Sequence, residues 1–216
     1  MILDETNVDA FLFDLDGTLT TTKPTYIQNV VHRTLQQLKS NGATAELVSK
    51  FWFERNRNET IKSGFGVDPE KFWPIFREID VPEKRRESII LYDDIDFVRK
   101  LRPQNKKVGS VTNAPENIAS INLHMIGLSY FDAIVTGEAG VPSKPDPAGI
   151  LLCLEKLRVP PERAAFIGNS DEDILAAKAA GVYDILIDRG EHVYPDVFPT
   201  KRITSLHQLD YLVGKK

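Results

Sequence analysis

The sequence predicts an α/β fold in which helices cover both faces of a parallel sheet. Two observations support this prediction: short apolar runs alternate with helical patterns along most of the chain, and polar residues follow the apolar runs. A third observation adds a domain, because one long stretch carries helical patterns alone. With 216 residues, of which 42% are hydrophobic and 27% charged, the chain has the composition of a globular protein.

The predicted strands are short apolar runs that end in turn-forming or polar residues. They cover residues 10–13, 107–112, 133–136, 164–167 and 183–187. The first run ends abruptly in Asp14-Leu15-Asp16-Gly17. Open α/β sheets bind ligands at the carboxyl ends of their strands, so this junction is the first candidate site.

Helical patterns lie between these runs. One opens near Pro115 and runs toward Gly127, a second runs from Pro147 to about residue 157, and a third begins near Ser170 and stops at Gly181. The repeated order of strand and helix predicts parallel strands covered on both faces.

The inserted domain is predicted at residues 20–90, where apolar residues follow helical spacing only. It interrupts a core formed by residues 1–19 and 91–216. Trp52 and Trp73 are expected in the interior of this small helical domain, and Leu206 to Leu212 is expected to form an amphipathic helix on the sheet of the core.

Charge and composition exclude several classes of protein. The net charge of -4 argues against a nucleic-acid binder, because affinity for polyanions comes from clustered basic residues. Cys153 is the single cysteine and lies in an apolar run, so we expect a buried thiol rather than a disulfide or nucleophile. The chain shows no membrane-spanning run and no secretory signal, and a cytoplasmic location is expected.

Asp14 and Asp16 can divide the work of phosphate ester hydrolysis. One carboxylate attacks phosphorus, and a second acid protonates the departing oxygen and then deprotonates water. Gly17 permits the backbone turn that aims both acids at one substrate. Because Asp14 and a phosphate repel each other, a cation is needed, and Mg²⁺ suits hard oxygen ligands. A polar turn without catalytic function is the alternative for this pattern alone.

The run Phe13 to Thr20, FDLDGTLT, resembles the first signature of the haloacid dehalogenase-like (HAD) hydrolase superfamily. The resemblance implies a Rossmann-like core and places a helical C1 cap at residues 20–90. It also implies that Asp14 is the nucleophile, that Asp16 is the general acid and base, and that both contribute to the metal site.

Two further signatures follow in order. Val108-Gly109-Ser110-Val111-Thr112-Asn113 resembles the second, which implies that Thr112 hydrogen-bonds a phosphoryl oxygen, and free amides at this strand-to-helix junction extend the substrate site to Asn113. Lys144, within Pro142-Ser143-Lys144-Pro145, resembles the lysine of the third, which neutralises the nucleophile and the phosphate.

The fourth signature is matched by Gly168-Asn169-Ser170-Asp171-Glu172-Asp173, with one departure. Asn169 stands where the family usually has a metal-binding aspartate. An asparagine carbonyl can still ligate Mg²⁺, so weaker metal binding is expected. Asp173 is expected to bind metal-coordinated water or to pair with Lys144. The expected metal set is thus Asp14, Asp16, Asn169 and Asp173.

The resemblance is strongest to the phosphoglycolate phosphatase-like branch, which implies hydrolysis of a small phosphorylated metabolite, phosphoglycolate-like or a sugar phosphate. Arg55 is a candidate for binding a carboxylate or second phosphate of the substrate. Dehalogenation is disfavoured, because it needs no leaving-group acid such as Asp16. A sugar phosphomutase and a non-catalytic phosphate-binding or interaction protein remain open, as does the choice between monomer and homodimer.

Overall fold

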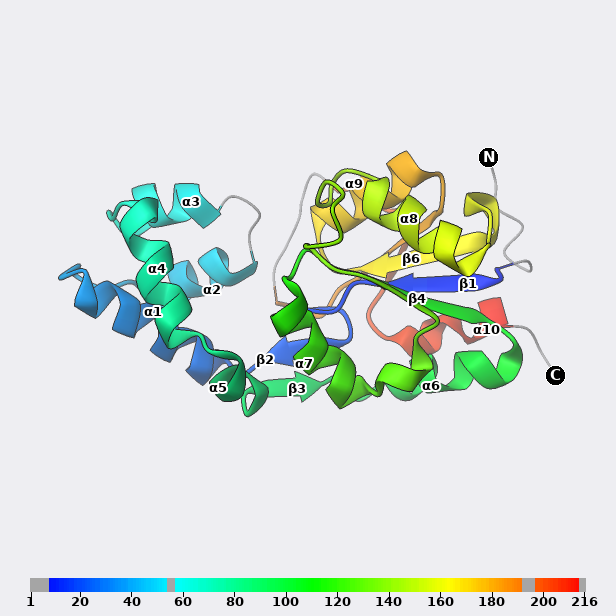
Figure 1. Ribbon diagram of the computed structural model, residues 1–216, viewed down its shortest axis with the longest axis horizontal. Coiled ribbons are helices and arrows are strands. Elements are labelled where there is room, and N and C mark those ends of the chain that lie inside the picture. Colours follow the sequence, from blue (N-terminus) through cyan, green and yellow to red (C-terminus); the bar gives the residue numbers. More distant parts are fainter. Residues whose placement is uncertain (1–7, 54–56, 192–196, 214–216) are drawn as a thin grey trace. The chain divides into compact units, whose positions relative to one another are not determined.

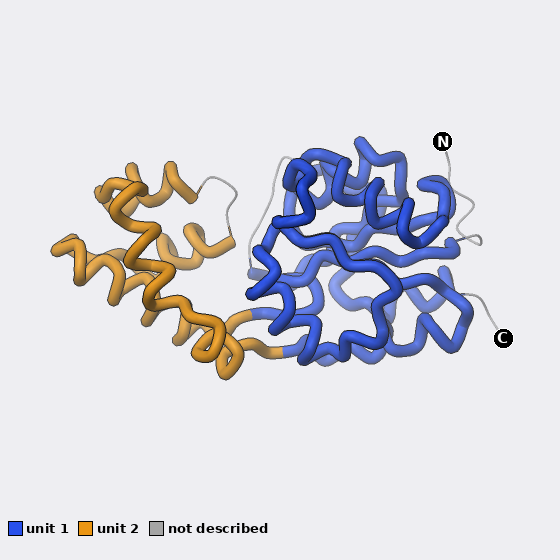
Figure 2. Tube along the Cα trace, viewed as in Figure 1, with its two compact units in different colours: residues 1–21, 91–216 blue, residues 22–90 orange. Residues whose placement is uncertain are grey.

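The computed structural model describes residues 8–53, 57–191 and 197–213. The chain divides into two compact units: unit 1 comprises residues 1–21 and 91–216, and unit 2 comprises residues 22–90 (Figure 2). The action of residues 20–90 as a cap stays a prediction.

Unit 1 is built on a six-stranded parallel sheet with the strand order β5-β4-β1-β6-β7-β8. Its strands are β1 (Ala10–Phe13), β4 (Lys107–Val111), β5 (Ala133–Val135), β6 (Ala164–Gly168), β7 (Tyr183–Ile187) and β8 (Lys201–Ile203). The first five occupy the runs predicted from the sequence. β1 is fully buried and lies in the middle of the sheet, so both of its faces must be covered.

Helices cover both faces of this sheet (Figure 1). On one face lie α8 (Ala148–Leu157) and α9 (Asp171–Ala180), and on the other lie α6 (Asp96–Leu101), α7 (Glu116–Ile126) and α10 (Asp210–Val213). Phe11 and Phe13 belong to one buried cluster, and Ala10 and Leu12 to the other, as expected when side chains alternate along a strand. The predicted α/β fold is confirmed.

The ends of the helices follow local chemistry. Ser170 caps α9 by accepting a hydrogen bond from the amide of Asp173 at 3.2 Å, and Gly181 ends it with a φ of 73°. Gly127 ends α7 with a φ of 114°. These glycines stop the helices where the sequence predicts, because a left-handed backbone costs glycine little.

Several short strands and turns were not predicted from the sequence. β8 was not predicted, nor was the two-stranded sheet formed by β2 (Thr20–Thr22) and β3 (Ile89–Leu91). Three residues are too few to show a period of two. Short 3-10 turns occupy residues 102–104, 128–130, 161–163 and 206–209. The buried residues Leu206, Leu209 and Leu212 pack in the same cluster as β1, so the terminal segment covers its own sheet.

Unit 2 consists mainly of helices around an aromatic core. Its elements are α1 (Pro24–Gln37), α2 (Ala45–Phe53), α3 (Arg57–Glu59), a π-turn at Thr60–Gly64, α4 (Pro69–Ile79) and α5 (Pro82–Arg86). Phe51 lies at the centre, with its ring 5.3 Å from that of Phe72 and 5.7 Å from that of Phe76. Trp52 is buried and Trp73 packs against this cluster, in agreement with the expected interior role.

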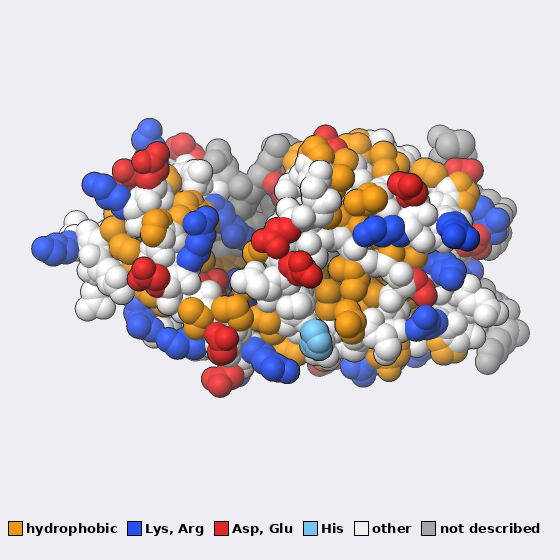
Figure 3. Space-filling view, viewed as in Figure 1, with side chains coloured by type: hydrophobic (Ala, Val, Ile, Leu, Met, Phe, Trp, Pro, Cys, Tyr) orange, Lys and Arg blue, Asp and Glu red, His pale blue; other side chains and the backbone are white. Residues whose placement is uncertain are grey.

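Acidic and basic side chains are interspersed on the face of unit 1 drawn in Figure 3. That face therefore presents no broad field of one sign. Within residues 8–53, 57–191 and 197–213, no helix has the length and apolar character needed to cross a bilayer.

Candidate active site

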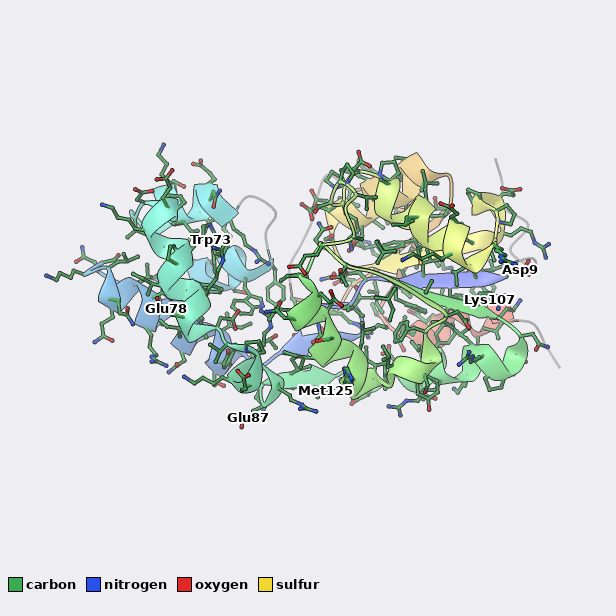
Figure 4. All side chains as sticks on the ribbon, in the orientation of Figure 1. Asp9, Trp73, Glu78, Glu87, Lys107 and Met125 are labelled. Atoms are coloured by element: carbon green, nitrogen blue, oxygen red, sulfur yellow. The ribbon has the colours of Figure 1, made fainter. Side chains whose placement is uncertain are left out.

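The candidate site lies at the carboxyl ends of three neighbouring strands. Asp14 follows β1, Thr112 follows β4 and Asn169 follows β6. β1 lies between the other two strands and runs parallel to both, so the three residues emerge at one edge of the sheet. Figure 4 labels Asp9 and Lys107 at the opposite edge, where β1 and β4 begin. The sheet thus gathers polar side chains where open α/β sheets bind ligands.

Lys144 links two of the predicted site residues. Its Nζ donates to Oδ1 of Asp14 at 2.8 Å and to Oδ1 of Asp173 at 2.6 Å. A third bond runs to the carbonyl of Val111 at 3.0 Å, at the end of β4. Only 4% of the Lys144 side chain is exposed, against 10% for Asp14 and 2% for Asp173. The three residues form a buried cluster with one cation between two carboxylates.

Burial sets the protonation of this cluster. It raises the pKa of Asp14 to about 7, and Lys144 only partly opposes the shift. Burial alone would lower the pKa of Lys144, but the charges of Asp14 and Asp173 outweigh it and hold that pKa above its ordinary value. Lys144 therefore stays protonated across the physiological range, and Asp14 ionises near neutrality.

A tight turn carries Asp16. The carbonyl of Leu15 accepts hydrogen bonds from the amides of Thr18, Leu19 and Thr20, and the amide of Gly17 donates to Thr20 at 2.6 Å. Gly17 has a φ of 82°, and a Cβ added there would lie 2.0 Å from Nδ2 of Asn169. Glycine is thus required twice, for its backbone conformation and for the close approach of Asn169.

Thr18 connects Asp14 to Asn169. Its buried hydroxyl lies 3.2 Å from Oδ1 of Asn169 and 3.4 Å from Oδ2 of Asp14, and it donates toward these acceptors. The two oxygens of Asp14 therefore have different neighbours: Oδ1 contacts Lys144, and Oδ2 lies on the side of Thr18 and Asn169.

Asp173 pairs with Lys144, which is one of its two expected roles. Its second oxygen, Oδ2, accepts from the backbone amides of Asn169 and Ser170 at 3.0 Å each and from the Ser170 hydroxyl at 2.8 Å. A Cβ on Gly168 would lie 2.3 Å from Cγ of Asp173, so a larger residue there would displace this carboxylate. Asp173 thus fixes Lys144 to the start of α9.

The side chain of Asn113 organises the loop that carries Lys144. Its Nδ2 donates to the Lys144 carbonyl at 3.0 Å, and its Oδ1 accepts from the Lys144 amide at 2.9 Å. The neighbouring Thr112 hydroxyl accepts from the amide of Ala114 at 3.1 Å, which leaves its proton for another acceptor. The substrate-binding roles of Thr112 and Asn113 stay predictions.

The oxygen atoms of this site suit a hard cation. Asp14 Oδ2, Asn169 Oδ1 and the backbone carbonyl of Asp16 are donors of the kind that Mg²⁺ prefers. No cluster of three acidic, histidine or cysteine side chains able to hold a metal occurs among the described residues. The amide of Asn169 offers an oxygen without a charge.

An ion pair beside the turn was not predicted from the sequence. Arg189, two residues after β7, binds both oxygens of Asp94 at 2.8 and 2.9 Å, and its Nη2 donates to the carbonyl of Thr18 at 2.7 Å. The partners are 95 residues apart, and neither belongs to a motif. Arg55, the predicted substrate ligand in the insertion, lies outside the described residues.

Comparisons with known proteins agree with the fold and the motifs. Pyrophosphatase PpaX from Anoxybacillus flavithermus is 30% identical over 179 residues, which cover 81% of each protein. Phosphoglycolate phosphatase from Pseudomonas putida is 30% identical over 183 residues, or 79% of this chain and 66% of that protein. A crystal structure of β-phosphoglucomutase from Clostridium difficile shares the fold, with a TM-score of 0.70, 18% identity and 94% coverage of each chain.

The family follows from these matches. A model described as haloacid dehalogenase-like hydrolase matches residues 8–181, which include all four motifs. The resemblance stated from the motifs is confirmed, and so is the expectation that the chain is a hydrolase. The chain belongs to the haloacid dehalogenase-like hydrolase family.

Proposed function

We propose that the chain is a Mg²⁺-dependent phosphatase that hydrolyses a small phosphorylated metabolite through an aspartyl-phosphate on Asp14. The observation that carries this proposal is the bond of 2.8 Å from Lys144 Nζ to Asp14 Oδ1. A buried lysine that holds one oxygen of a carboxylate at a strand end orients that carboxylate and lowers the repulsion that an incoming phosphate meets.

The first step transfers the phosphoryl group to the protein. A carboxylate oxygen of Asp14 forms a bond to phosphorus while the bond from phosphorus to the ester oxygen breaks. Asp16 gives its proton to that oxygen, which leaves as an alcohol. The Thr112 hydroxyl and Lys144 bind phosphoryl oxygens.

The second step returns the protein to its starting state. Asp16, now ionised, takes a proton from water as the water oxygen attacks phosphorus. The bond between phosphorus and Asp14 breaks, and inorganic phosphate leaves. One ester and one water thus give one alcohol and one phosphate, with Asp14 again a carboxylate and Asp16 again an acid.

Asp14, the backbone carbonyl of Asp16 and Asn169 would hold Mg²⁺, with Asp173 acting behind them through Lys144 and the backbone of Asn169. When bound, Mg²⁺ would polarise a phosphoryl oxygen and offset the charge of the phosphate. Asn169 makes the donor set less negative than one with an aspartate there, so we expect weaker metal binding.

The names of the relatives support the substrate class. Phosphoglycolate phosphatase and pyrophosphatase PpaX are both 30% identical to this chain over about 180 residues. We therefore propose a phosphoglycolate-like compound or sugar phosphate as the substrate. A cytoplasmic location and a monomeric or homodimeric state stay predictions.

Release of phosphate from a generic aryl phosphate, with and without Mg²⁺, tests the proposal. We expect turnover that depends on Mg²⁺ and is lost in Asp14→Asn. If the folded protein shows no turnover with any divalent metal ion, the result would favour a second candidate function, that of a non-catalytic phosphate-binding protein. Activity that appears only in Asn169→Asp would identify Asn169 as the reason.

A sugar phosphomutase is a third candidate, because β-phosphoglucomutase from Clostridium difficile has the same fold. A mutase needs the same nucleophile and acid, but it returns the phosphoryl group to a sugar rather than to water. Incubation with hexose 1-phosphates separates the two functions: isomerisation without release of phosphate would favour the mutase.

A further inference from the structure

We propose that Arg189 is a positioning residue for the phosphatase reaction: it holds the turn formed by residues 15–20 and thereby orients Asp16. The inference rests on the proposed function, since it assigns a task to the turn that carries the proposed acid. Arg189 lies in none of the four motifs and follows β7, the strand beyond β6 in the sheet.

The contact between Arg189 and the turn is direct. Arg189 Nη2 donates to the carbonyl of Thr18 at 2.7 Å, which is a short, charge-assisted hydrogen bond. Thr18 stands two residues after Asp16, and its own hydroxyl points toward Asp14 and Asn169. A shift of the Thr18 peptide would therefore move the acid and the neighbours of the nucleophile together.

Arg189 adds an external bond to the hydrogen bonds within the turn, and it does so on the far side of Gly17 from Asp16. This glycine separates Asp16 from Thr18 and adopts a φ of 82°. Glycine has the least intrinsic preference for any one backbone conformation, so it does not itself fix the direction of the Asp16 side chain. The bond from Arg189 to the carbonyl of Thr18 restricts that freedom beyond what the hydrogen bonds within the turn achieve.

Arg189 is itself held rigidly on two sides. Its guanidinium binds both carboxylate oxygens of Asp94, and its central carbon lies 4.0 Å from the ring centroid of Tyr92. Both partners of the ion pair are only 7% exposed. Oδ2 of Asp94 also accepts from the amide of Leu206 at 2.8 Å, which ties the pair to the terminal segment.

This geometry requires an arginine. Two bonds to Asp94, a third to a backbone carbonyl and stacking on Tyr92 use the planar fork of a guanidinium. A lysine keeps the charge but offers one small ammonium group, which cannot fill all these positions. Arg189→Lys therefore weakens the hold on the turn while keeping a cation near Asp94.

The leaving group of the substrate provides the test. Ethyl phosphate needs protonation of its departing oxygen, whereas 2,4-dinitrophenyl phosphate releases a stable anion without it. With Arg189→Lys we expect the rate of the first step, measured as release of the alcohol or phenolate in a single turnover with protein in excess, to fall by roughly 10-fold to 100-fold for ethyl phosphate, the scale of a misplaced catalytic group. The same rate should change far less for the dinitrophenyl ester. A single turnover is needed because Asp16 also acts in the second step, which is identical for both substrates.

Arg202→Lys is the matched control, because Arg202 pairs with Asp188 at 3.2 Å on the same part of the sheet with its side chain 45% exposed. This substitution should leave the first-step rates of both substrates unchanged. In Arg189→Lys, an equal fall of the first-step rates of both substrates would indicate a structural role alone and overturn the inference. No fall in either rate would also overturn it.

Hydrogen exchange separates this inference from the proposed function. In Arg189→Lys, the amides of residues 15–20 should exchange faster than in the native protein, while in Arg202→Lys they should not. If the native protein hydrolyses neither ester, the phosphatase proposal fails, and unchanged exchange in Arg189→Lys would still overturn the anchoring of the turn by Arg189.

Discussion

Lys144 Nζ donates to Oδ1 of Asp14 across 2.8 Å, and both side chains are buried. Because Asp173 binds the same ammonium group at 2.6 Å, one cation holds two carboxylates at the carboxyl edge of the sheet. Lys144 is the shared partner of both carboxylates, so the cluster couples the stability of the core to the chemistry proposed for Asp14.

Removal of the cation should destabilise the fold. In Lys144→Met, two buried carboxylates lose their partner, which typically costs about 3–5 kcal/mol. Urea unfolding in mildly alkaline buffer with a chelator measures this loss. Lys100→Met is the control, because Lys100 pairs with Asp96 across one exposed helical turn and should change stability little. Similar losses in both variants would contradict the buried role of Lys144.

Asp14 should make the metal-free protein less stable as pH rises. Burial raises its pKa from about 4 in an unfolded chain to about 7, so the folded state binds the extra proton between these values. Its contribution to the free energy of unfolding therefore decreases from about pH 4 to about pH 7 and then levels off. Asp14→Asn should remove this slope, and an unchanged slope would assign it to other groups.

The neutral side chain at position 169 should limit metal affinity. Asn169→Asp adds a carboxylate beside Asp14, so we expect Mg²⁺ to bind roughly tenfold more tightly, since ligand charge tunes such sites. The same charge should destabilise the protein without metal. Titration calorimetry and thermal unfolding with a chelator measure the two effects, and unchanged affinity would argue that Asn169 lies outside the metal site.

Gly17 should tolerate no side chain. Gly17→Ala combines a left-handed backbone, which costs about 1–2 kcal/mol, with a Cβ placed 2.0 Å from Nδ2 of Asn169. Gly140→Ala is matched, because Gly140 has a φ of 77° and no atom within 4 Å of its added Cβ. Gly17→Ala should lose more stability and also Mg²⁺ affinity. Equal effects would show that Asn169 can move away freely.

Cys153 should be inert in the folded protein. Its thiol is buried under β4, and burial raises its pKa to about 12, so almost no thiolate forms in mildly alkaline buffer. A disulfide reagent should therefore modify this single cysteine only after unfolding in urea. Rapid reaction of the native protein would contradict the described packing of α8 on the sheet.

The fold was predictable where each element carries its own signal. β1 ends where an apolar run meets Asp14, and Ser170 and Gly181 cap the two ends of α9. The motifs also brought Asp14 and Lys144 together, although 130 residues separate them. β8 was not predictable, because its three residues pair with β7 only after the sheet has formed.

Two contacts between loops could not be predicted from the sequence. The pair of Arg189 and Asp94 depends on where two loops meet in space. The local sequence around each residue looks like that around an ordinary exposed charged residue. The hydrogen bonds from the Asn113 side chain to the backbone of Lys144 were not predicted either, and the substrate-binding role of Asn113 stays a prediction. That contact needs the positions of two loops, which spacing along the chain does not supply.

The central claim is the aspartyl-phosphate on Asp14, and trapping it is the most direct test. The protein would be mixed with an aryl phosphate and Mg²⁺, quenched during turnover and reduced with borohydride, which converts an aspartyl-phosphate to homoserine. The account predicts homoserine at position 14 by mass spectrometry, and none in Asp14→Asn. Continued hydrolysis in Asp14→Asn, or turnover without modification of Asp14, would contradict it.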